Sequence, residues 1–375
     1  MTINRAQFLQ RAAVLGLLAT TTGLATTTTA AATGQRNLTL KGVAYDTGTG
    51  FLGDDSRALW RTDLMRGELR AIRHRLHANW VSIYGSDVRR LTDTATAALE
   101  QGLTVSIQPR SFDEPQADEL EKLRKVAVEA ERLRRRCDQD QEVILAIGCE
   151  FMLFTPGIVP GATFFERVEY LTKGEFDWPV LVRRFREFTA RMVKVARSNF
   201  KGRITYGAAS DLEPVDWSLF DIVGLDYYSY HADRADHTKE LAPFRALGKP
   251  ILILEFGCCT FTGAAELGGM GWDIVDFSGD VPVIPPQYVR NEQEQADHLA
   301  NMLAVFTAEG FLGASPYTFI SPDAPHRPHD RPHDEDMAAY SLCKVLRTHE
   351  DDPASPYHWQ PKKSFHSVSR FYLTH

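Results

Sequence analysis

The feature that most constrains the fold is a regular alternation of short β-branched segments with longer amphipathic segments, from residue 38 onward. Strands separated by helices predict βαβ units, in which the strands are parallel and each helix crosses between them. We expect eight strands, at residues 40–45, 80–85, 103–109, 143–150, 204–209, 221–227, 250–255 and 311–319. We expect helices at residues 57–76, 88–100, 116–137, 178–199, 239–247, 292–309 and 337–346, and a single turn at residues 214–219.

Eight strands in this rhythm favour a closed α/β barrel, the (β/α)₈ or TIM barrel, as one domain at residues 38–375. The total length of 375 residues is within the range of single-domain barrels. The alternative is an open doubly wound sheet, but no G-x-G-x-x-G motif follows the first predicted strand.

The first 32 residues have the pattern of an export signal peptide, with a disordered tail as the alternative. Arg5 lies in a short polar start, residues 12–25 are apolar or small, and residues 30–32 offer a small-residue cleavage site. The start resembles a twin-arginine signal in which Ala6 replaces the second arginine. No cysteine follows that run to carry a lipid, and no later stretch reaches the roughly 18 apolar residues of a membrane span. We therefore expect a secreted or extracytoplasmic protein without a stable membrane anchor.

Charge and cysteine content narrow the classes of partner. Asp and Glu number 49 against 42 Lys and Arg, which gives a net charge of −7. A mildly acidic chain is not expected to bind nucleic acid. Five cysteines are an odd number for a disulfide framework in an exported chain, so we expect buried thiols.

Two predicted strands run apolar and then end in a glutamate, Glu150 on the fourth strand and Glu255 on the seventh. A buried, unpaired carboxylate is costly, so both positions need a reason. The C-terminal ends of the strands form the catalytic face of a barrel, and we expect the two side chains to project together into a cleft there. One protonated and one ionised carboxyl group form the pair used by retaining glycosidases. The alternative is that Arg110 or lysines pair with both glutamates and merely close the barrel mouth.

Strict alternation of side chains along a strand assigns a face to the neighbours of each glutamate. If Glu150 points into the barrel, alternation turns Cys149 toward the helices. On the seventh strand, alternation places Ile251 and Ile253 on the face of Glu255.

Polar and aromatic side chains near the strand ends are expected to bind the substrate. The long connections at residues 151–178, 256–290 and 320–336 are rich in aromatic residues, Gly and Pro, a composition that suits stacking on sugar rings. A hydroxyl group from the tyrosine pair after the sixth strand could donate to Glu255 and keep it ionised. The expected substrate-binding residues are Asp46, Gln108, Arg110, Asp226, Tyr227, Tyr228, Trp272, Tyr317 and His329.

The segment 326–336 carries three histidines among acidic residues and is the one sequence cluster that resembles a metal site. Its two prolines, Pro328 and Pro332, predict an extended loop, which does not align ligands as a helix would. We therefore expect a polar loop that lines the substrate, with no metal and no cofactor. A metal-dependent hydrolase that uses this loop is kept as an alternative.

Glutamates that end strands four and seven, with a tyrosine after strand six, resemble the clan A retaining glycoside hydrolases. The resemblance covers most of residues 38–372 and includes the segment 359–365, which resembles the last-helix region of many such enzymes. It implies that Glu150 is the acid/base and Glu255 the nucleophile of a double displacement on an extracytoplasmic carbohydrate. The clan usually has Asn before the acid/base and Arg on strand two, where this chain has Cys149 and Ser82.

Three runs of residues, at 147–154, 215–221 and 254–260, resemble a set of bacterial proteins described as abortive infection proteins. That description implies no mechanism for these residues. A third hypothesis, besides the glycosidase and the metal-dependent hydrolase, is a non-catalytic barrel that binds a glycan or a protein.

Overall fold

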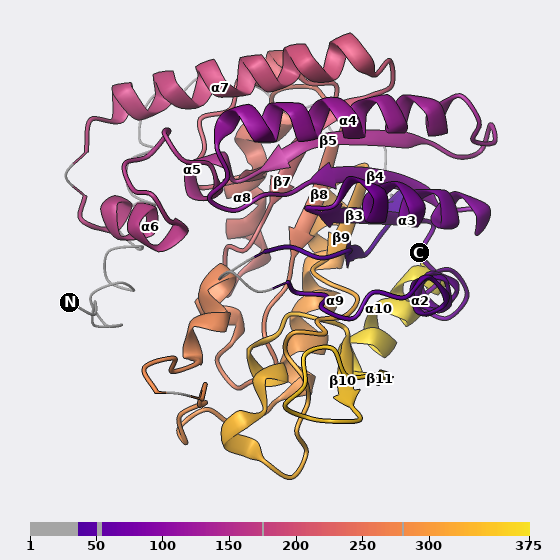
Figure 1. Ribbon diagram of the computed structural model, residues 1–375, viewed down its shortest axis with the longest axis vertical. Helices are drawn as coiled ribbons and strands as arrows, with labels where there is room; N and C mark the ends of the chain where they lie inside the picture. The colour runs from indigo at the N-terminus through magenta and orange to yellow at the C-terminus, as the bar shows by residue number, and fades with distance from the viewer. Residues whose placement is uncertain (1–36, 51–54, 175, 280) are drawn as a thin grey trace.

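The computed structural model describes residues 37–50, 55–174, 176–279 and 281–375 (Figure 1). The predicted export signal at residues 1–32 lies outside the described residues. Among the residues that are described, no helix has the length and apolarity that crossing a membrane requires.

Within the described residues, nine parallel strands form one sheet in the order β1-β9-β8-β7-β6-β5-β4-β3-β2. They are β1 (Leu40–Lys41), β2 (Ala44–Asp46), β3 (Trp80–Gly85), β4 (Thr104–Pro109), β5 (Val143–Cys149), β6 (Ile204–Ala209), β7 (Val223–Asp226), β8 (Ile251–Phe256) and β9 (Gly313–Pro316). The strands β1 and β2 are two halves of the first predicted strand. Because β1 pairs with β9 and β2 pairs with β3, the sheet closes on itself. The predicted single-domain (β/α)₈ barrel is confirmed.

The first strand is interrupted at Gly42 and Val43. These two residues connect β1 and β2, which are the two edges of the sheet. A Cβ atom on Gly42 would lie 2.2 Å from Cε3 of Trp80, so only glycine fits beside the indole ring. On one side of the interruption, the Gly42 amide donates to the carbonyl oxygen of Ala314. On the other side, the Ser82 amide donates to the carbonyl oxygen of Val43. The chain therefore changes pairing partner here without leaving the barrel.

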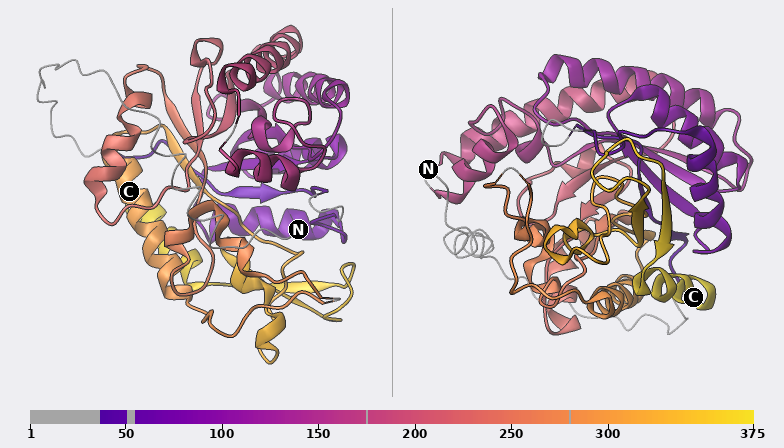
Figure 2. Two further views of the ribbon diagram at one scale, coloured as in Figure 1. Left: turned by 90° about the vertical axis from the view of Figure 1, so that its left-hand side faces the viewer. Right: turned by 60° about the horizontal axis from the view of Figure 1, so that its bottom comes forward.

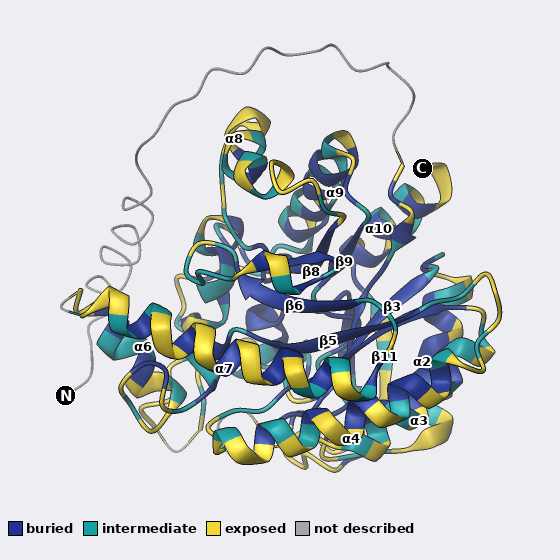
Figure 3. Ribbon diagram, turned by 90° about the horizontal axis from the view of Figure 1, so that it is seen from above, coloured by how far each residue is buried: buried dark blue, intermediate teal, exposed yellow. Residues whose placement is uncertain are grey.

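Helices follow most strands and pack on the outside of the sheet (Figures 1 and 2). Figure 3 shows α4 and α7 with a buried stripe toward the strands and an exposed stripe away from them. Only a short 3-10 turn, η2 (Trp217–Leu219), follows β6, as the sequence predicts. The outer helices are α2 (Thr62–His74), α3 (Val88–Glu100), α4 (Gln116–Arg134), α7 (Trp178–Asn199), α8 (Arg234–Arg245), α9 (Glu292–Glu309) and α10 (Lys363–Thr374).

The predicted helix at residues 337–346 is wrong. The chain forms a 3-10 turn, η5 (Glu335–Ala338), and then a strand, β10 (Cys343–Arg347), which pairs antiparallel with β11 (Tyr357–Pro361). Cys343 and Val345 are buried and Lys344 between them is less so, which is the period of a strand. The last outer helix is instead α10, and the predicted loop 151–178 also contains two helices, α5 (Phe151–Phe154) and α6 (Phe164–Thr172).

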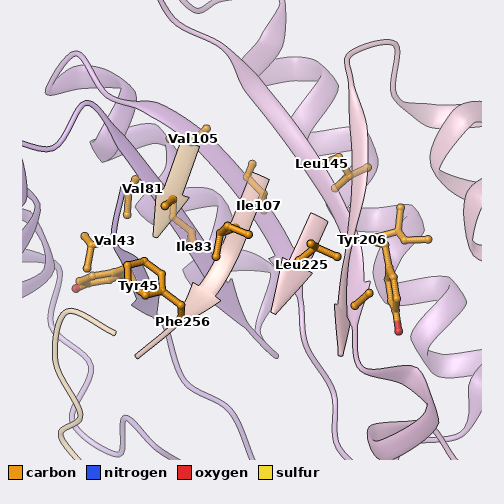
Figure 4. Packing of buried hydrophobic residues seen from close by; sticks show 14 of the residues in the cluster. Val43, Tyr45, Val81, Ile83, Val105, Ile107, Leu145, Tyr206, Leu225 and Phe256 are labelled. Atoms are coloured by element: carbon orange, nitrogen blue, oxygen red, sulfur yellow. The ribbon is translucent and has the colours of Figure 1, made fainter. Parts of the chain in front are cut away.

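The buried apolar side chains form an outer layer and an inner layer on either side of the sheet. The outer layer lies between strands and helices, and Figure 4 shows part of it, from Val43 and Val81 across to Leu225. The inner layer fills the barrel and consists of Leu40, Trp80, Ile144, Ile222, Leu252 and Leu254. A further cluster lies under the loops that follow β8 and β9, around η3 (Ala265–Ile274).

The described cysteines are free thiols, as expected. Four of them are buried, and Cys137 is partly buried.

Candidate active site

Irregular pairing at the ends of β5 and β8 decides which side chains reach the barrel mouth. The register between β5 and β6 shifts between Ala146 and Cys149, and Gly148 in between has a φ of +150°. The register of β8 shifts against both of its neighbours, and Glu255 is paired with Asp226 of β7. A shift of one residue exchanges the inner and outer faces of a strand.

Strict alternation therefore assigns the wrong face to some residues of both strands. Ile251 and Ile253 belong to the outer layer against the helices, whereas Leu252 and Leu254 fill the barrel interior. Glu255 follows the register shift and still points inward.

Cys149 also faces the interior rather than the helices. A Cβ atom on Gly207 would meet both Cys149 Cβ, at 2.9 Å, and Asp226 Oδ2, at 2.8 Å. Burial raises the pKa of the Cys149 thiol well above its ordinary value, and the nearby Arg110 guanidinium opposes this. The thiol is therefore neutral and lies beside the charged groups of the mouth.

Glu255 is nearly buried, at 7% exposure, and is held as a carboxylate by two donors. Arg110 Nη2 donates to Oε1 in a buried ion pair, and the Tyr228 hydroxyl donates to Oε2 at 3.0 Å. Hydrogen bonds to an ionised carboxylate from a cation and from a hydroxyl favour the charged form. A tyrosine donor to Glu255 was expected from the sequence. Arg110 was expected as a substrate-binding residue, and its pairing with Glu255 was part of the alternative in which the glutamates close the barrel mouth.

The Arg110 guanidinium is itself fixed in place. Gln108 Oε1 accepts hydrogen bonds from Arg110 Nε, at 3.1 Å, and Nη2, at 2.6 Å. The guanidinium carbon lies 4.1 Å from the centre of the Tyr84 ring, which stacks on Tyr317 with ring centres 5.5 Å apart. Tyr84 was not among the residues expected from the sequence, although its place near the end of a strand, two residues after Ser82, could have indicated it.

Glu150 has a different environment from Glu255. It is partly buried, directly precedes α5, and has a left-handed backbone with φ 44° and ψ 45°. Such a conformation is strained in a residue other than glycine and is concentrated at functional sites. Burial, followed by the negative charges of Glu255 and Glu213, raises the pKa of Glu150 to about 8. Glu150 is therefore protonated at neutral pH.

Glu213 is a second residue that the sequence did not single out. Its carboxyl oxygens accept from the Tyr206 hydroxyl at 2.8 and 2.9 Å and from the Met152 and Ala209 amides at 2.9 and 3.1 Å. It thereby ties the loop after β6 to the start of α5, where Glu150 stands. Burial raises the pKa of Glu213 to about 8.

Asp226 was expected at the mouth and lies there, close to both glutamates. Burial, followed by the charges of Glu255 and Glu150, raises its pKa well above the ordinary value. Neither of its carboxyl oxygens has a hydrogen-bond partner within the described part of the chain. A buried carboxyl group in this situation carries a proton.

Asp46 ends β2 and is buried, but its contacts are with the following loop. It accepts from Ser56 Oγ at 2.5 Å and from the Gly48 amide at 2.8 Å. Burial raises its pKa, and Arg110 is among the cations that oppose this.

Three expected site residues are not joined to the carboxylate pair. Tyr227 points to the outer side, where its hydroxyl lies 2.8 Å from His237 Nδ1 and donates to Glu240 Oε2 at 2.9 Å. Trp272 lies edge-on to Phe165, with ring centres 6.4 Å apart. His329 is exposed on the 326–336 loop.

The 326–336 loop uses its acidic residues for ion pairs. Asp334 Oδ1 lies 2.8 Å from His326 Nδ1, and Asp336 pairs with Arg290, at 2.7 Å, and with the buried Lys362, at 2.9 Å. Among the described residues, this loop does not bring three ligand groups together. The alternative of a metal-dependent hydrolase that uses the loop therefore lacks a ligand set.

Solved structures of glycoside hydrolases share this fold. A GH113 β-1,4-mannanase is 14% identical with a TM-score of 0.57, over 90% of this chain and 100% of that chain. The GH113 β-mannanase AaManA from Alicyclobacillus acidocaldarius is 15% identical with a TM-score of 0.51, over 90% of this chain and 98% of that chain. The GH2 β-galacturonidase from Eisenbergiella tayi is 16% identical with a TM-score of 0.53, over 91% of this chain but 52% of that one.

At these identities the likeness establishes the fold alone, a (β/α)₈ barrel. No protein-family model matches the sequence, and no curated protein matches it.

Proposed function

We propose that this chain is a retaining glycoside hydrolase, with Glu150 as acid/base and Glu255 as nucleophile. The observation that carries the proposal is the difference between the two carboxyl groups at one barrel mouth. Glu255 receives hydrogen bonds from Arg110 and Tyr228, whereas the pKa of Glu150 is raised to about 8 by burial and by the charge of Glu255. Two carboxyl groups held in opposite protonation states are what a double displacement requires.

In the first step, Glu150 donates its proton to the glycosidic oxygen while Glu255 attacks the anomeric carbon. The bond from that carbon to the leaving oxygen breaks, and an ester between sugar and Glu255 forms. In the second step, Glu150, now ionised, takes a proton from water. The water oxygen attacks the anomeric carbon and releases Glu255 as a carboxylate.

Arg110 and Tyr228 support these steps through Glu255. Both donors hold the carboxylate in one orientation, and the cation stabilises its charge when the ester bond breaks. Arg110 comes from the end of β4, so a cation reaches the nucleophile although strand two has Ser82 in place of the clan's arginine. Cys149, in place of the usual Asn, offers the substrate a thiol instead of an amide.

The fold neighbours guide the choice of substrates to be tested. They include a β-1,4-mannanase and a β-galacturonidase, whose names describe β-linked substrates. We propose a β-linked carbohydrate as the substrate class. The proposed extracytoplasmic location depends on residues 1–32, and the resemblance to abortive infection proteins stays a prediction that no comparison tests.

The test is hydrolysis by the Glu150→Gln and Glu255→Gln variants on a panel of β-mannan, β-glucuronides, β-galacturonides and aryl β-glycosides. We expect each variant to lose about 10²–10⁴-fold in kcat on natural glycans. An aryl glycoside whose leaving group needs no proton should still form the ester in Glu150→Gln, so that a burst of phenol appears. Glu187→Gln on α7, an exposed glutamate, is the matched control and should match wild type.

Product stereochemistry, followed by NMR in the first minutes of hydrolysis, should show retention of the anomeric configuration. If both variants turn over glycans as wild type does, the two-glutamate mechanism is wrong. Glycan binding by wild type without hydrolysis of any member of the panel would favour the non-catalytic barrel.

A further inference from the structure

A second cluster of polar side chains lies on the outer side of the β7 end, away from the carboxylate pair. His231 is in the connection after β7, and His237 and Glu240 are on α8. One ligand atom from each of the three lies within 4.8 Å of the others. Because His237 and Glu240 are three residues apart on a helix, they share one face, and His231 lies against it.

The contacts within this cluster orient all three groups. His231 Nε2 lies 2.6 Å from Glu240 Oε2, and the Tyr227 hydroxyl lies 2.8 Å from His237 Nδ1 and 2.9 Å from Glu240 Oε2. Ser229 Oγ donates to the other carboxylate oxygen, Oε1, at 2.6 Å. Hydrogen bonds of this kind from neighbouring residues hold metal ligands in place in known sites.

The donor set determines which ion would bind. Two imidazoles and one carboxylate are ligands of Zn²⁺ and of its first-row neighbours, whereas Mg²⁺ and Ca²⁺ prefer oxygen ligands throughout. Ligand atoms about 2.0–2.2 Å from a tetrahedral ion lie roughly 3.4 Å from one another. His231 Nε2 and Glu240 Oε2 are closer than this, at 2.6 Å, and the three ligand atoms all lie within 4.8 Å of one another, so shifts of about 1 Å in the side chains would complete the geometry.

Burial and charge also suit a cation. His237 and Tyr227 are buried, while His231 and Glu240 keep 33% and 28% of their side chains exposed, which leaves an entry path and room for a water ligand. Within the described residues, no lysine or arginine forms an ion pair with Glu240. The carboxylate charge is therefore available to a metal ion.

We propose that His231, His237 and Glu240 bind one divalent transition-metal ion of the Zn²⁺ type, with Tyr227 positioning two of the ligands. The ion links the loop after β7 to α8. Tyr228, next in the chain, points the other way and contacts Glu255, so the metal site is separate from the proposed catalytic pair. Its role is to brace the segment that carries Tyr228.

The experiment uses the untagged full chain, freed of metal by a chelator and titrated with ZnCl₂ by calorimetry and by equilibrium dialysis with elemental analysis. We expect one Zn²⁺ per chain, a melting temperature that rises with Zn²⁺ concentration, and no such effect of Mg²⁺. Co²⁺ in the same site should give visible absorption bands that report its coordination.

Two variants and one control make the test specific. His231→Ala and Glu240→Gln should each lower Zn²⁺ affinity by roughly 100-fold or more and abolish the Co²⁺ bands. His329→Ala removes an exposed histidine outside the cluster and should bind Zn²⁺ as wild type does. Because His231 is partly exposed on a loop, its replacement should not disturb the fold. The melting temperature of His231→Ala should therefore equal that of metal-free wild type.

The proposal is overturned if metal-free wild type binds no Zn²⁺ at micromolar concentration. It is also overturned if His231→Ala and Glu240→Gln bind Zn²⁺ as tightly as wild type. In either case, the cluster is a hydrogen-bonded network that serves packing alone.

Discussion

At the scale of single residues, the mouth of the barrel gives two glutamates opposite protonation states. Glu255 has two donors, and one of them is the Arg110 cation. Glu150 has no such partner in the described residues and is adjacent to acidic neighbours. The same side chain is therefore ionised at one strand end and protonated at the other.

The raised pKa of Glu150 predicts the pH dependence of activity. The general acid must be protonated, so kcat/KM should fall as pH rises through about 8. The profile of kcat/KM between pH 5 and 10, on the substrate found in the panel, is the measurement. A descending limb two pH units away from 8 would contradict this assignment of Glu150.

The same pKa can be measured without a substrate. In Glu255→Gln the neighbouring negative charge is gone, so the pKa of Glu150 should fall from about 8 toward its ordinary value of 4.5. Burial remains and prevents a complete return. Carbon-13 NMR of labelled glutamate carboxyl groups would follow this titration, and Glu187→Gln should leave it unchanged.

At this scale the sequence was informative about residue type and less so about direction. It indicated Glu150, Glu255, Arg110 and Tyr228 because polar residues that end apolar strands stand out. It could not decide between Tyr227 and Tyr228, because the choice depends on the side-chain face at the last residue of a short strand. Tyr84 was missed because a tyrosine in an apolar strand has the same pattern as a core residue.

At the scale of the elements, the ends of β5 and β8 depart from regular strand geometry. Alternation predicts the faces of Ile144 and Leu145 correctly, since no shift precedes them. It fails at Cys149, after Gly148, and at Ile253, before Glu255. Such shifts are common near active sites, where they redirect a side chain, and they depend on local backbone angles that a hydrophobic pattern does not encode.

Gly148 should be indispensable for the shift in β5. Its φ is +150°, and an added Cβ atom would lie 2.4 Å from Cε1 of Phe151. Gly148→Ala should therefore lower the free energy of unfolding by about 2 kcal/mol or more and displace Glu150, with loss of activity. Urea unfolding and the glycan assay would measure the two effects.

Gly67→Ala is the matched control for this substitution. Gly67 is within α2, and the nearest atom to its added Cβ, Arg70 Nη2, is 3.8 Å away. The free energy of unfolding of this variant should rise by about 0.5–1 kcal/mol, because alanine is more stable than glycine within a helix. If Gly148→Ala unfolds like Gly67→Ala, the irregular strand end does not depend on glycine.

At the scale of the whole molecule, the barrel could be predicted because eight strands recur at a regular spacing along the chain. Closure depends on one local feature, the break at Gly42, which hydrophobic periodicity does not reveal. The region after β9 was predicted incorrectly for a related reason. Residues 337–346 are compatible with a helix by composition, but the antiparallel partner 357–361, at a distance in sequence, selects a strand.

Several carboxyl groups buried in the fold make the stability of the whole chain depend on pH. Glu119, Glu150 and Glu213 each have a pKa raised to about 8, chiefly by burial. An acid whose pKa is higher in the folded state binds its proton more tightly there than in the unfolded chain. Its contribution to stability is complete below about pH 4.5 and is lost as pH rises through about 8.

Glu119→Gln isolates this effect at a carboxyl group that the proposed mechanism does not use. Glu119 is 6% exposed, and its carboxyl group is hydrogen-bonded to Thr155 Oγ1 at 3.0 Å. An amide of the same shape does not ionise, so at pH 9 the variant should be more stable than wild type, on the order of 2 to 4 kcal/mol. At pH 5 both proteins should unfold at similar urea concentrations, since the wild-type carboxyl group is protonated there. The exposed control Glu187→Gln should have the urea unfolding curve of wild type at both pH values. If Glu119→Gln also unfolds like wild type at pH 9, ionisation of Glu119 does not destabilise the folded protein.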